Sequence, residues 1–307
     1  MANPFVCGKC KGPVTKWHRR DRGTKRLKDE MGRDLYRCKT CKSVTSDPFI
    51  DRLQADELTQ LPLGRGLVLD APADFDLFLT SDWHCGSNVC HYDGLKAMIR
   101  RAVETPNARM IISGDQMEMT PPGHHDGGRE STCYPDQQII RTAEALKPIA
   151  SRIDLILAGN HGRSRFLQQS QIDPDLILSY TLGVKYSRAP VVTQYRTPKG
   201  TVRIGSGHGK SGAKNSVLEV EKLAAIFPGC DLYHLGHDHN LFAQQEGGMV
   251  YDEDGVEHWS GTWYCRTGSF LRYAEYARFS FYRPKPCGYL IAKIRGGKVA
   301  DVEVVKS

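Results

Sequence analysis

Seven side chains in the middle of the chain are of the types that bind divalent metal ions. They are carboxylates, imidazoles and one carboxamide: Asp82, His84, Asp115, Asn160, His208, His237 and His239. Such oxygen and nitrogen ligands suit borderline to hard cations such as Mn, Fe and Zn. Seven ligands, one of them shared, are enough for two ions that keep positions for water. A bridging carboxylate would hold the ions about 3.5–4 Å apart, which suits an in-line displacement at phosphorus.

Apolar runs directly before these residues predict the strands that must position them. The runs, each ending in a turn with Asp, Asn or His, are 75–79, 110–112, 153–158, 202–204 and 232–235. Open α/β folds place their ligands at the carboxyl edge of the sheet. We therefore expect the five turns to meet, with Asp115 at the centre of the cluster.

The spacing of apolar residues elsewhere predicts the rest of the fold. Helical spacing occurs at 95–103, 139–149, 176–182 and 217–227, and it alternates with the strands as in βαβ units. Beyond His239 the helical pattern disappears, and antiparallel strands are expected at 249–251, 262–266, 289–294 and 299–305. The predicted fold class is α/β (α+β): a four-layer αββα sandwich of two mixed sheets with flanking helices.

Three parts of the chain are distinguished by composition: a zinc ribbon at 1–50, a linker rich in Pro and Gly at 51–73, and the large domain at 74–307. The ribbon contains two Cys-x-x-Cys pairs, Cys7/Cys10 and Cys38/Cys41. Paired spacing of this kind is typical of a structural zinc site with four thiolates. A redox dithiol is the alternative, but one pair would suffice for it.

The net charge of +7 is unevenly distributed. Residues 1–50 carry 13 Lys and Arg against 5 Asp and Glu, whereas the remainder carries 29 against 30. A localised basic segment favours a polyanionic partner, here nucleic acid, and a merely solvated surface is the alternative. No apolar run has the length of a membrane span and no signal-peptide core is present, so we expect a cytoplasmic protein without a membrane partner.

The order of the ligand motifs resembles that of the calcineurin-like metallophosphoesterases over roughly residues 75–240. The matching motifs are Asp82-x-His84, Gly114-Asp115, Gly159-Asn160-His161, His208 and Gly236-His237-x-His239. The resemblance implies two metal sites, the first formed by Asp82, His84 and His239, the second by Asn160, His208 and His237, with Asp115 as the bridge. It also implies that His161, which is not a ligand, stabilises or protonates the leaving oxygen.

Two departures from the family pattern affect these expectations. The acid that often follows Gly-Asn-His and orients the histidine is replaced by Gly162, so another residue must hold His161, and Asp238 is a candidate. Asp115 is followed by Gln116-Met117-Glu118 rather than by the Asp-Arg-Gly of the phosphoprotein phosphatases. This difference disfavours a Ser/Thr phosphatase.

Several basic and imidazole side chains near the motifs are candidates for substrate contact. Arg163, Arg165 and Lys210 follow ligand turns, while His124 and His125 lie in an irregular insertion at 119–136. A solvated loop is the alternative for His124 and His125.

The favoured function is a two-metal phosphodiesterase, a nuclease on DNA or RNA that is closest to the repair-type nucleases of the superfamily. Mn is the expected active-site metal, with Fe, Zn or Ni as alternatives. A phosphodiesterase or phosphatase for small molecules such as cyclic nucleotides is the first competing hypothesis. The second is a non-catalytic module that binds nucleic acid or protein on a phosphoesterase scaffold.

Overall fold

The computed structural model describes residues 14–16, 36–42, 44–45, 59–120, 131–210, 216–273, 275–279, 281 and 283–307. The chain forms two compact units, Met1–Gln60 and Leu61–Ser307. In the smaller unit, strands β1 (Val14–Lys16), β2 (Tyr36–Cys38) and β3 (Val44–Thr45) pair antiparallel. Cys38 ends β2, and the turn that follows contains Cys41. Cys7 and Cys10 lie outside the described residues, so the zinc ribbon stays a prediction.

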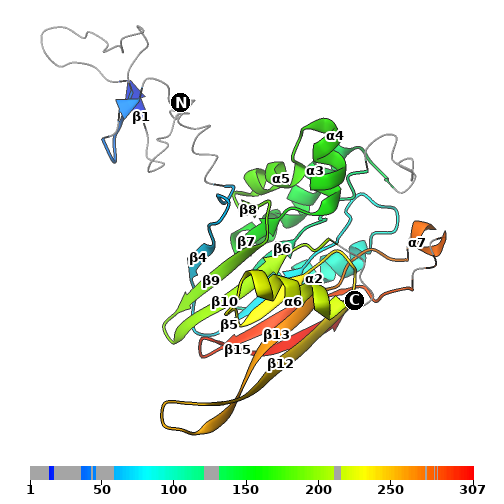
Figure 1. Ribbon diagram of the computed structural model, residues 1–307. Helices are drawn as coiled ribbons and strands as arrows, with labels where there is room; N and C mark the ends of the chain where they lie inside the picture. The colour runs from blue at the N-terminus through cyan, green and yellow to red at the C-terminus, as the bar shows by residue number, and fades with distance from the viewer. Residues whose placement is uncertain are drawn as a thin grey trace, which may run out of the picture. The chain divides into compact units, whose positions relative to one another are not determined.

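The larger unit contains two six-stranded mixed sheets (Figure 1). The first sheet has the order β15-β14-β5-β6-β7-β8, and the second has the order β12-β13-β11-β10-β9-β4. The strands of the first sheet are β5 (Phe75–Thr80), β6 (Arg109–Ser113), β7 (Ile153–Leu157), β8 (Lys185–Ser187), β14 (Gly288–Arg295) and β15 (Lys298–Lys306). Those of the second are β4 (Leu67–Asp70), β9 (Val191–Thr197), β10 (Gly200–Gly207), β11 (Leu232–Leu235), β12 (Leu241–Tyr251) and β13 (Glu257–Thr267).

Six α-helices are described: α2 (Tyr92–Glu104), α3 (Pro135–Leu146), α4 (Gln168–Ser170), α5 (Pro174–Leu182), α6 (Ser216–Ile226) and α7 (Glu275–Phe279). A 3₁₀ turn at Lys147–Arg152 and a π-helix at His161–Leu167 complete the helical elements. No helix among the described residues is long and apolar enough to cross a membrane.

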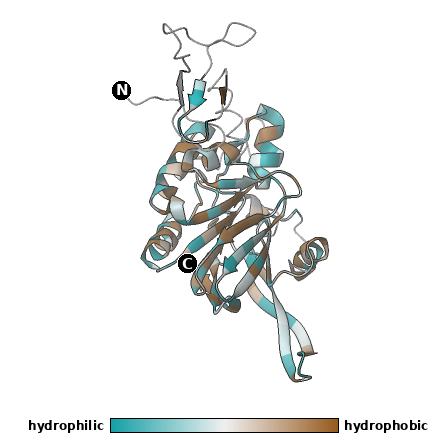
Figure 2. Ribbon diagram, turned by 90° about the vertical axis from the view of Figure 1, so that its left-hand side faces the viewer, coloured by the Kyte–Doolittle hydropathy of each residue, from teal (hydrophilic) through white to brown (hydrophobic). Residues whose placement is uncertain are grey.

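Successive side chains of the central strands alternate between two hydrophobic cores, and this alternation explains the layered fold. In β5, Leu77 and Leu79 join the core between the sheets, whereas Phe78 joins the core beneath the helices. Successive side chains of a strand point to opposite faces, so a strand buried on both faces is a continuous apolar run. The strand register places side chains of the same core next to one another. Leu79 lies opposite Ile111, and Ile111 lies opposite Leu155, and all three belong to the core between the sheets. Figure 2 shows these apolar strands at the centre of the larger unit.

Helices cover the outer face of each sheet. On the first sheet, Met98 of α2, Leu146 of α3 and Leu178 of α5 are fully buried. On the second, Val220 and Leu223 of α6 form a smaller cluster. The predicted αββα sandwich is therefore confirmed.

Two predictions about elements need correction. Residues 61–73, expected to be linker, contain β4, which pairs parallel with β9, and Leu61 N donates to Tyr186 O at 2.7 Å. This edge strand is only four residues long and is flanked by Gly and Pro, so its pattern is weak. Beyond His239, where no helix was expected, the short helix α7 is present.

Candidate metal centre

The ligand candidates lie on loops at the carboxyl ends of five strands. Strands β5, β6 and β7 run parallel in one sheet, and β10 and β11 run parallel in the other. Parallel strands end at the same edge, so their turns converge. The loops are also tied to one another, because Asp82 N donates to Gly114 O and His84 N to Asp115 O, both at 3.0 Å.

Five of the seven ligand candidates adopt a left-handed backbone conformation. Their φ angles are 51° at Asp82, 51° at His84, 52° at Asp115, 76° at His237 and 58° at His239. Non-glycine residues rarely adopt positive φ, and such strain persists only where surrounding contacts impose it. The concentration of these conformations in one place indicates a functional site.

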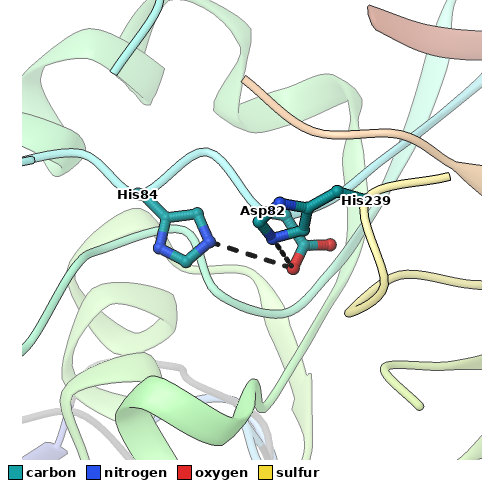
Figure 3. Close-up of side chains that lie close together, drawn as sticks. All are labelled: Asp82, His84 and His239. Carbon is teal, nitrogen blue, oxygen red and sulfur yellow. Dashed lines mark ion pairs between the residues drawn. The ribbon is translucent and has the colours of Figure 1, made fainter. Parts of the chain in front are cut away.

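The first donor set consists of Asp82, His84 and His239 (Figure 3). Asp82 Oδ1 lies 4.0 Å from His84 Nε2 and 3.5 Å from His239 Nε2. Both Asp82 Oδ1 and His84 Nε2 are buried and have no hydrogen-bond partner among the described residues. Unpaired buried polar atoms are unfavourable, and a metal ion bound by all three side chains would satisfy them. This donor set therefore fits a divalent cation.

The second donor set consists of Asp115, Asn160, His208 and His237. Asn160 Oδ1 lies 2.8 Å from His208 Nε2 and 2.8 Å from His237 Nδ1, and Asp115 Oδ2 lies 3.1 Å from His208 Nε2. His208 Nδ1 donates to Ser113 O at 2.7 Å, which turns Nε2 toward the other donors. Oxygen and imidazole donors converging in this way are typical of a transition-metal site.

The carboxylates of Asp82 and Asp115 are ionised at neutral pH. Burial opposes ionisation of Asp82, but the charges of His208 and His239 lower its pKa to about 2. Burial likewise opposes ionisation of Asp115, whose pKa His208 and His161 hold well below the ordinary value. Two buried carboxylates need compensating positive charge, which bound divalent cations would supply.

Glycines before the ligands permit these close approaches. A Cβ at Gly159 would collide with the carboxylate of Asp115, and a Cβ at Gly236 would collide with that of Asp82. The glycines of the Gly-Asn and Gly-His motifs are therefore required because a larger residue would not fit beside the ligand carboxylates.

His161 stands beside the two donor sets. Its Nδ1 lies 2.5 Å from Glu118 O, and its Nε2 lies 4.0 Å from Asp115 Oδ2. Burial lowers its pKa to about 4, although the charge of Asp115 acts in the opposite direction. The ring packs edge-on against His84, with 4.6 Å between the ring centroids.

Glu118 is the residue that holds His161, and sequence reasoning missed it. Its Oε2 lies 2.9 Å from His84 Nδ1, and its Oε1 lies 3.5 Å from His161 Nδ1. The suggestion that Asp238 orients His161 was wrong, because Asp238 faces Arg266 and Asn240. An acidic residue between Met117 and Met119, three positions after a ligand, was the signal that could have identified Glu118.

A second carboxylate fills the space beside Gly162. A Cβ at Gly162 would collide with Asp175, which extends from α5 and is buried. Asp175 Oδ2 accepts from Gly159 N at 3.3 Å. Burial and the nearby charges of Asp173 and Asp115 raise its pKa well above the ordinary value. Asp175 therefore supports the Gly159-Asn160-His161 turn through its hydrogen bond to Gly159 N.

The candidates for substrate contact lie in different places in the structure. Arg163 and Lys210 line a cavity next to the second donor set. Arg165 instead approaches His161, with 3.4 Å between its Nη1 and Nδ1 of that ring. His124 and His125 lie outside the described residues. His234 is a satisfied core histidine, bonded to Ser206 Oγ at 2.7 Å.

Comparisons with known proteins give only weak likenesses. No protein-family model and no curated protein matches the chain. Among solved structures, wild-type Vps29 from Entamoeba histolytica, complexed with zinc, is 11% identical, covers 76% of this chain and 98% of its own, and has a TM-score of 0.37. The calcineurin-like phosphoesterase YfkN from Bacillus subtilis is 14% identical, covers 76% and 91%, and has a TM-score of 0.38.

A metallophosphoesterase from Sphaerobacter thermophilus is 12% identical, covers 75% of this chain and 88% of its own, and has a TM-score of 0.36. At this level the likeness carries no argument about function. The functional assignment therefore rests on the geometry of the site itself.

Proposed function

We propose that this chain is a two-metal phosphodiesterase that hydrolyses DNA or RNA. The observation that carries the proposal is the pair of adjacent donor sets. One of them contains Asp82 Oδ1 and His84 Nε2, which are buried and have no hydrogen-bond partner among the described residues. Divalent metals in such a pair neutralise charge on phosphoryl oxygens and make water a better nucleophile.

Each side chain has a defined task in this proposal. The first metal is held by Asp82, His84 and His239, and the second by Asn160, His208 and His237, with Asp115 between them. Glu118 fixes the ring of His84 through Nδ1, just as Ser113 O fixes the ring of His208. Contacts of this kind leave Nε2 as the ligand atom and increase its basicity. The donors are oxygens and imidazoles without a thiolate, which suits Mn, with Fe, Zn or Ni as alternatives.

His161 assists the leaving oxygen. Its Nδ1 donates to Glu118 O, and this contact directs Nε2 toward the donor sets. A phosphate bound in the site would bring negative charge near the ring and favour its protonated form. The proton on Nε2 then passes to the departing oxygen.

The choice of nucleic acid as substrate is supported by charge. Residues 1–50 carry 13 basic and 5 acidic side chains, and a zinc site formed by Cys7, Cys10, Cys38 and Cys41 would hold that segment together. A compact basic unit attached to a phosphodiesterase centre suits a polyanionic substrate.

The proposal is tested by stripping the protein with a chelator and reloading it with Mn. We expect hydrolysis of bis(p-nitrophenyl) phosphate, and of single-stranded DNA, double-stranded DNA or RNA, only after reloading. Asp115→Ala should abolish turnover, while the exposed control Asp136→Asn should not. Turnover of cyclic nucleotides without any cutting of polynucleotides would support the small-molecule alternative. If no substrate were hydrolysed, the hypothesis of a non-catalytic binding module would be favoured.

A further inference from the structure

A cavity of about 780 Å³ lies beside the second donor set. Asn160, His208 and His237 line it, together with residues of the π-helix, of helix α6 and of the segments that follow β8 and β10. A volume of this size accommodates a ligand much larger than one phosphate group. The cavity is therefore open to a portion of substrate that extends past the metal centre.

Four cationic side chains line this cavity, and they come from four separate segments. They are Arg163 of the π-helix, Arg188 after β8, Lys210 after β10 and Lys222 of α6. Two of them are held in place, because Arg163 Nη1 donates to Arg188 O at 3.3 Å and Arg188 Nε donates to Asp173 Oδ2 at 2.8 Å. Convergence from four segments distinguishes this group from a charge run along one solvated helix.

The acidic residue of the lining, Glu219, does not cancel these charges. Its Oε2 accepts from Arg266 Nη2 at 2.7 Å, and its Oε1 accepts from Lys210 N at 2.8 Å. Arg266 is fully buried behind the cavity and compensates the carboxylate. The cavity thus presents a net positive surface to a ligand.

Apolar side chains share the lining of the cavity with the cations. Pro190, Leu223 and Ile226 line the cavity, and the Ile226 side chain is exposed although it is large and apolar. Cations beside apolar side chains match a nucleotide, whose phosphate is anionic and whose base has an apolar face.

We infer that this cavity binds a second phosphate of the substrate, with its adjoining nucleoside, next to the phosphate that is cut. This inference rests on the proposed function and narrows its substrate to oligonucleotides and polynucleotides. A cyclic nucleotide, which has a single phosphate, would bring no second anionic group to the cations of this cavity.

The test compares ligands that differ by one phosphate. Binding of thymidine 3′,5′-bisphosphate and of thymidine 3′-monophosphate to the Mn-loaded full chain is measured by calorimetry. We expect the bisphosphate to bind about tenfold more tightly, because hydrogen bonds to charged groups contribute about that much. This difference in affinity should disappear in the double variant Arg163→Gln/Lys222→Gln and persist in the exposed control Lys96→Gln. Lys222→Gln alone should reduce it in part.

A hydrolysis assay separates the inference from the proposed function. Wild-type protein should cut the 5′-phosphorylated dinucleotide pTpT with a higher kcat/KM than TpT, and the double variant should lose that preference. Equal affinities for the two thymidine phosphates, or a difference that survives in the double variant, would overturn the inference. If none of bis(p-nitrophenyl) phosphate, TpT and pTpT were hydrolysed, the proposed function itself would be overturned.

Discussion

His161 illustrates how a single side chain is set for one role by its surroundings. Its Nδ1 is bound to Glu118 O, so only Nε2 faces the donor sets. His161→Ala should lower kcat by ~10²–10⁴, the range of general acid–base catalysis, with both metals retained. The loss should be smaller for a diester with a nitrophenolate leaving group, which needs no proton. Equal losses on good and poor leaving groups would show that His161 positions the substrate.

Glu118 acts on the metals through His84. Its carboxylate lies 2.9 Å from His84 Nδ1 and increases the electron density of that ring. Glu118→Gln keeps the shape but removes the charge, so Mn affinity should fall by ~10–100-fold, the usual effect of losing such a partner. Titration calorimetry measures it, and Glu144→Gln, on the exposed face of α3, is the control. Unchanged affinity in Glu118→Gln would exclude this role.

At the scale of elements, the strand-end turns depend on glycine for their packing. Gly159→Ala would place a Cβ against Asp115, so the carboxylate of this ligand candidate must move. We expect less Mn per chain and loss of most diesterase activity in this variant. Gly248→Ala, where nothing lies within 4 Å of the added carbon, should have neither effect. Elemental analysis after gel filtration gives the metal content, and a full Mn complement in Gly159→Ala would contradict the prediction.

Strand β13 and helix α6 are joined to the last ligand turn by one buried arginine. Arg266 donates to Gly236 O and to Glu219 Oε2, both at 2.7 Å, and its Nε lies 3.6 Å from Asp238 Oδ2. Arg266→Met would remove a buried cation that both carboxylates contact, and breaking a buried charge pair costs about 3–5 kcal/mol. Urea unfolding should show this decrease in the free energy of unfolding, whereas the exposed control Arg100→Met should change that free energy little. A loss below about 1 kcal/mol would mean that Glu219 and Asp238 are solvated by other groups.

At the scale of the whole molecule, the excess of basic charge is concentrated in the first 50 residues. Removing residues 1–50 eliminates an excess of eight basic charges but no candidate metal ligand of the active site. Hydrolysis of a small diester should therefore remain close to that of the full chain. Affinity for DNA or RNA should fall, and the slope of log K against log salt should become shallower as phosphate contacts are lost.

Charge reversal at Arg19, Arg20, Lys25 and Arg26 should reproduce the shallower slope in the full chain. These residues lie outside the described part of the structure, so the prediction rests on the sequence. A truncated protein with the same affinity and the same salt slope would exclude a nucleic-acid role for the N-terminal unit. A protein-docking role would then be favoured.

Local patterns in the sequence were sufficient to predict the strands that carry the ligand candidates, and the candidates themselves. An apolar run buried on both faces is a local property, and so is the Gly-Asp or Gly-Asn-His turn that ends it. The predicted run 153–158 differs by one residue from β7, and the predicted run 110–112 lies within β6. The turns meet because parallel strands end at one edge, which the alternation of strands and helices already implied.

Only the tertiary structure decided which side chains support the site. Glu118 reaches His161 across 43 positions, and Arg266 reaches Glu219 across 47, so neither pairing leaves a local pattern. Asp238 was chosen for its position beside two ligands, yet the buried guanidinium of Arg266 attracts its carboxylate. The four cations of the cavity are similarly scattered along the chain. Sequence determines what each turn can bind, but the packing of distant segments determines which groups surround the bound ligand.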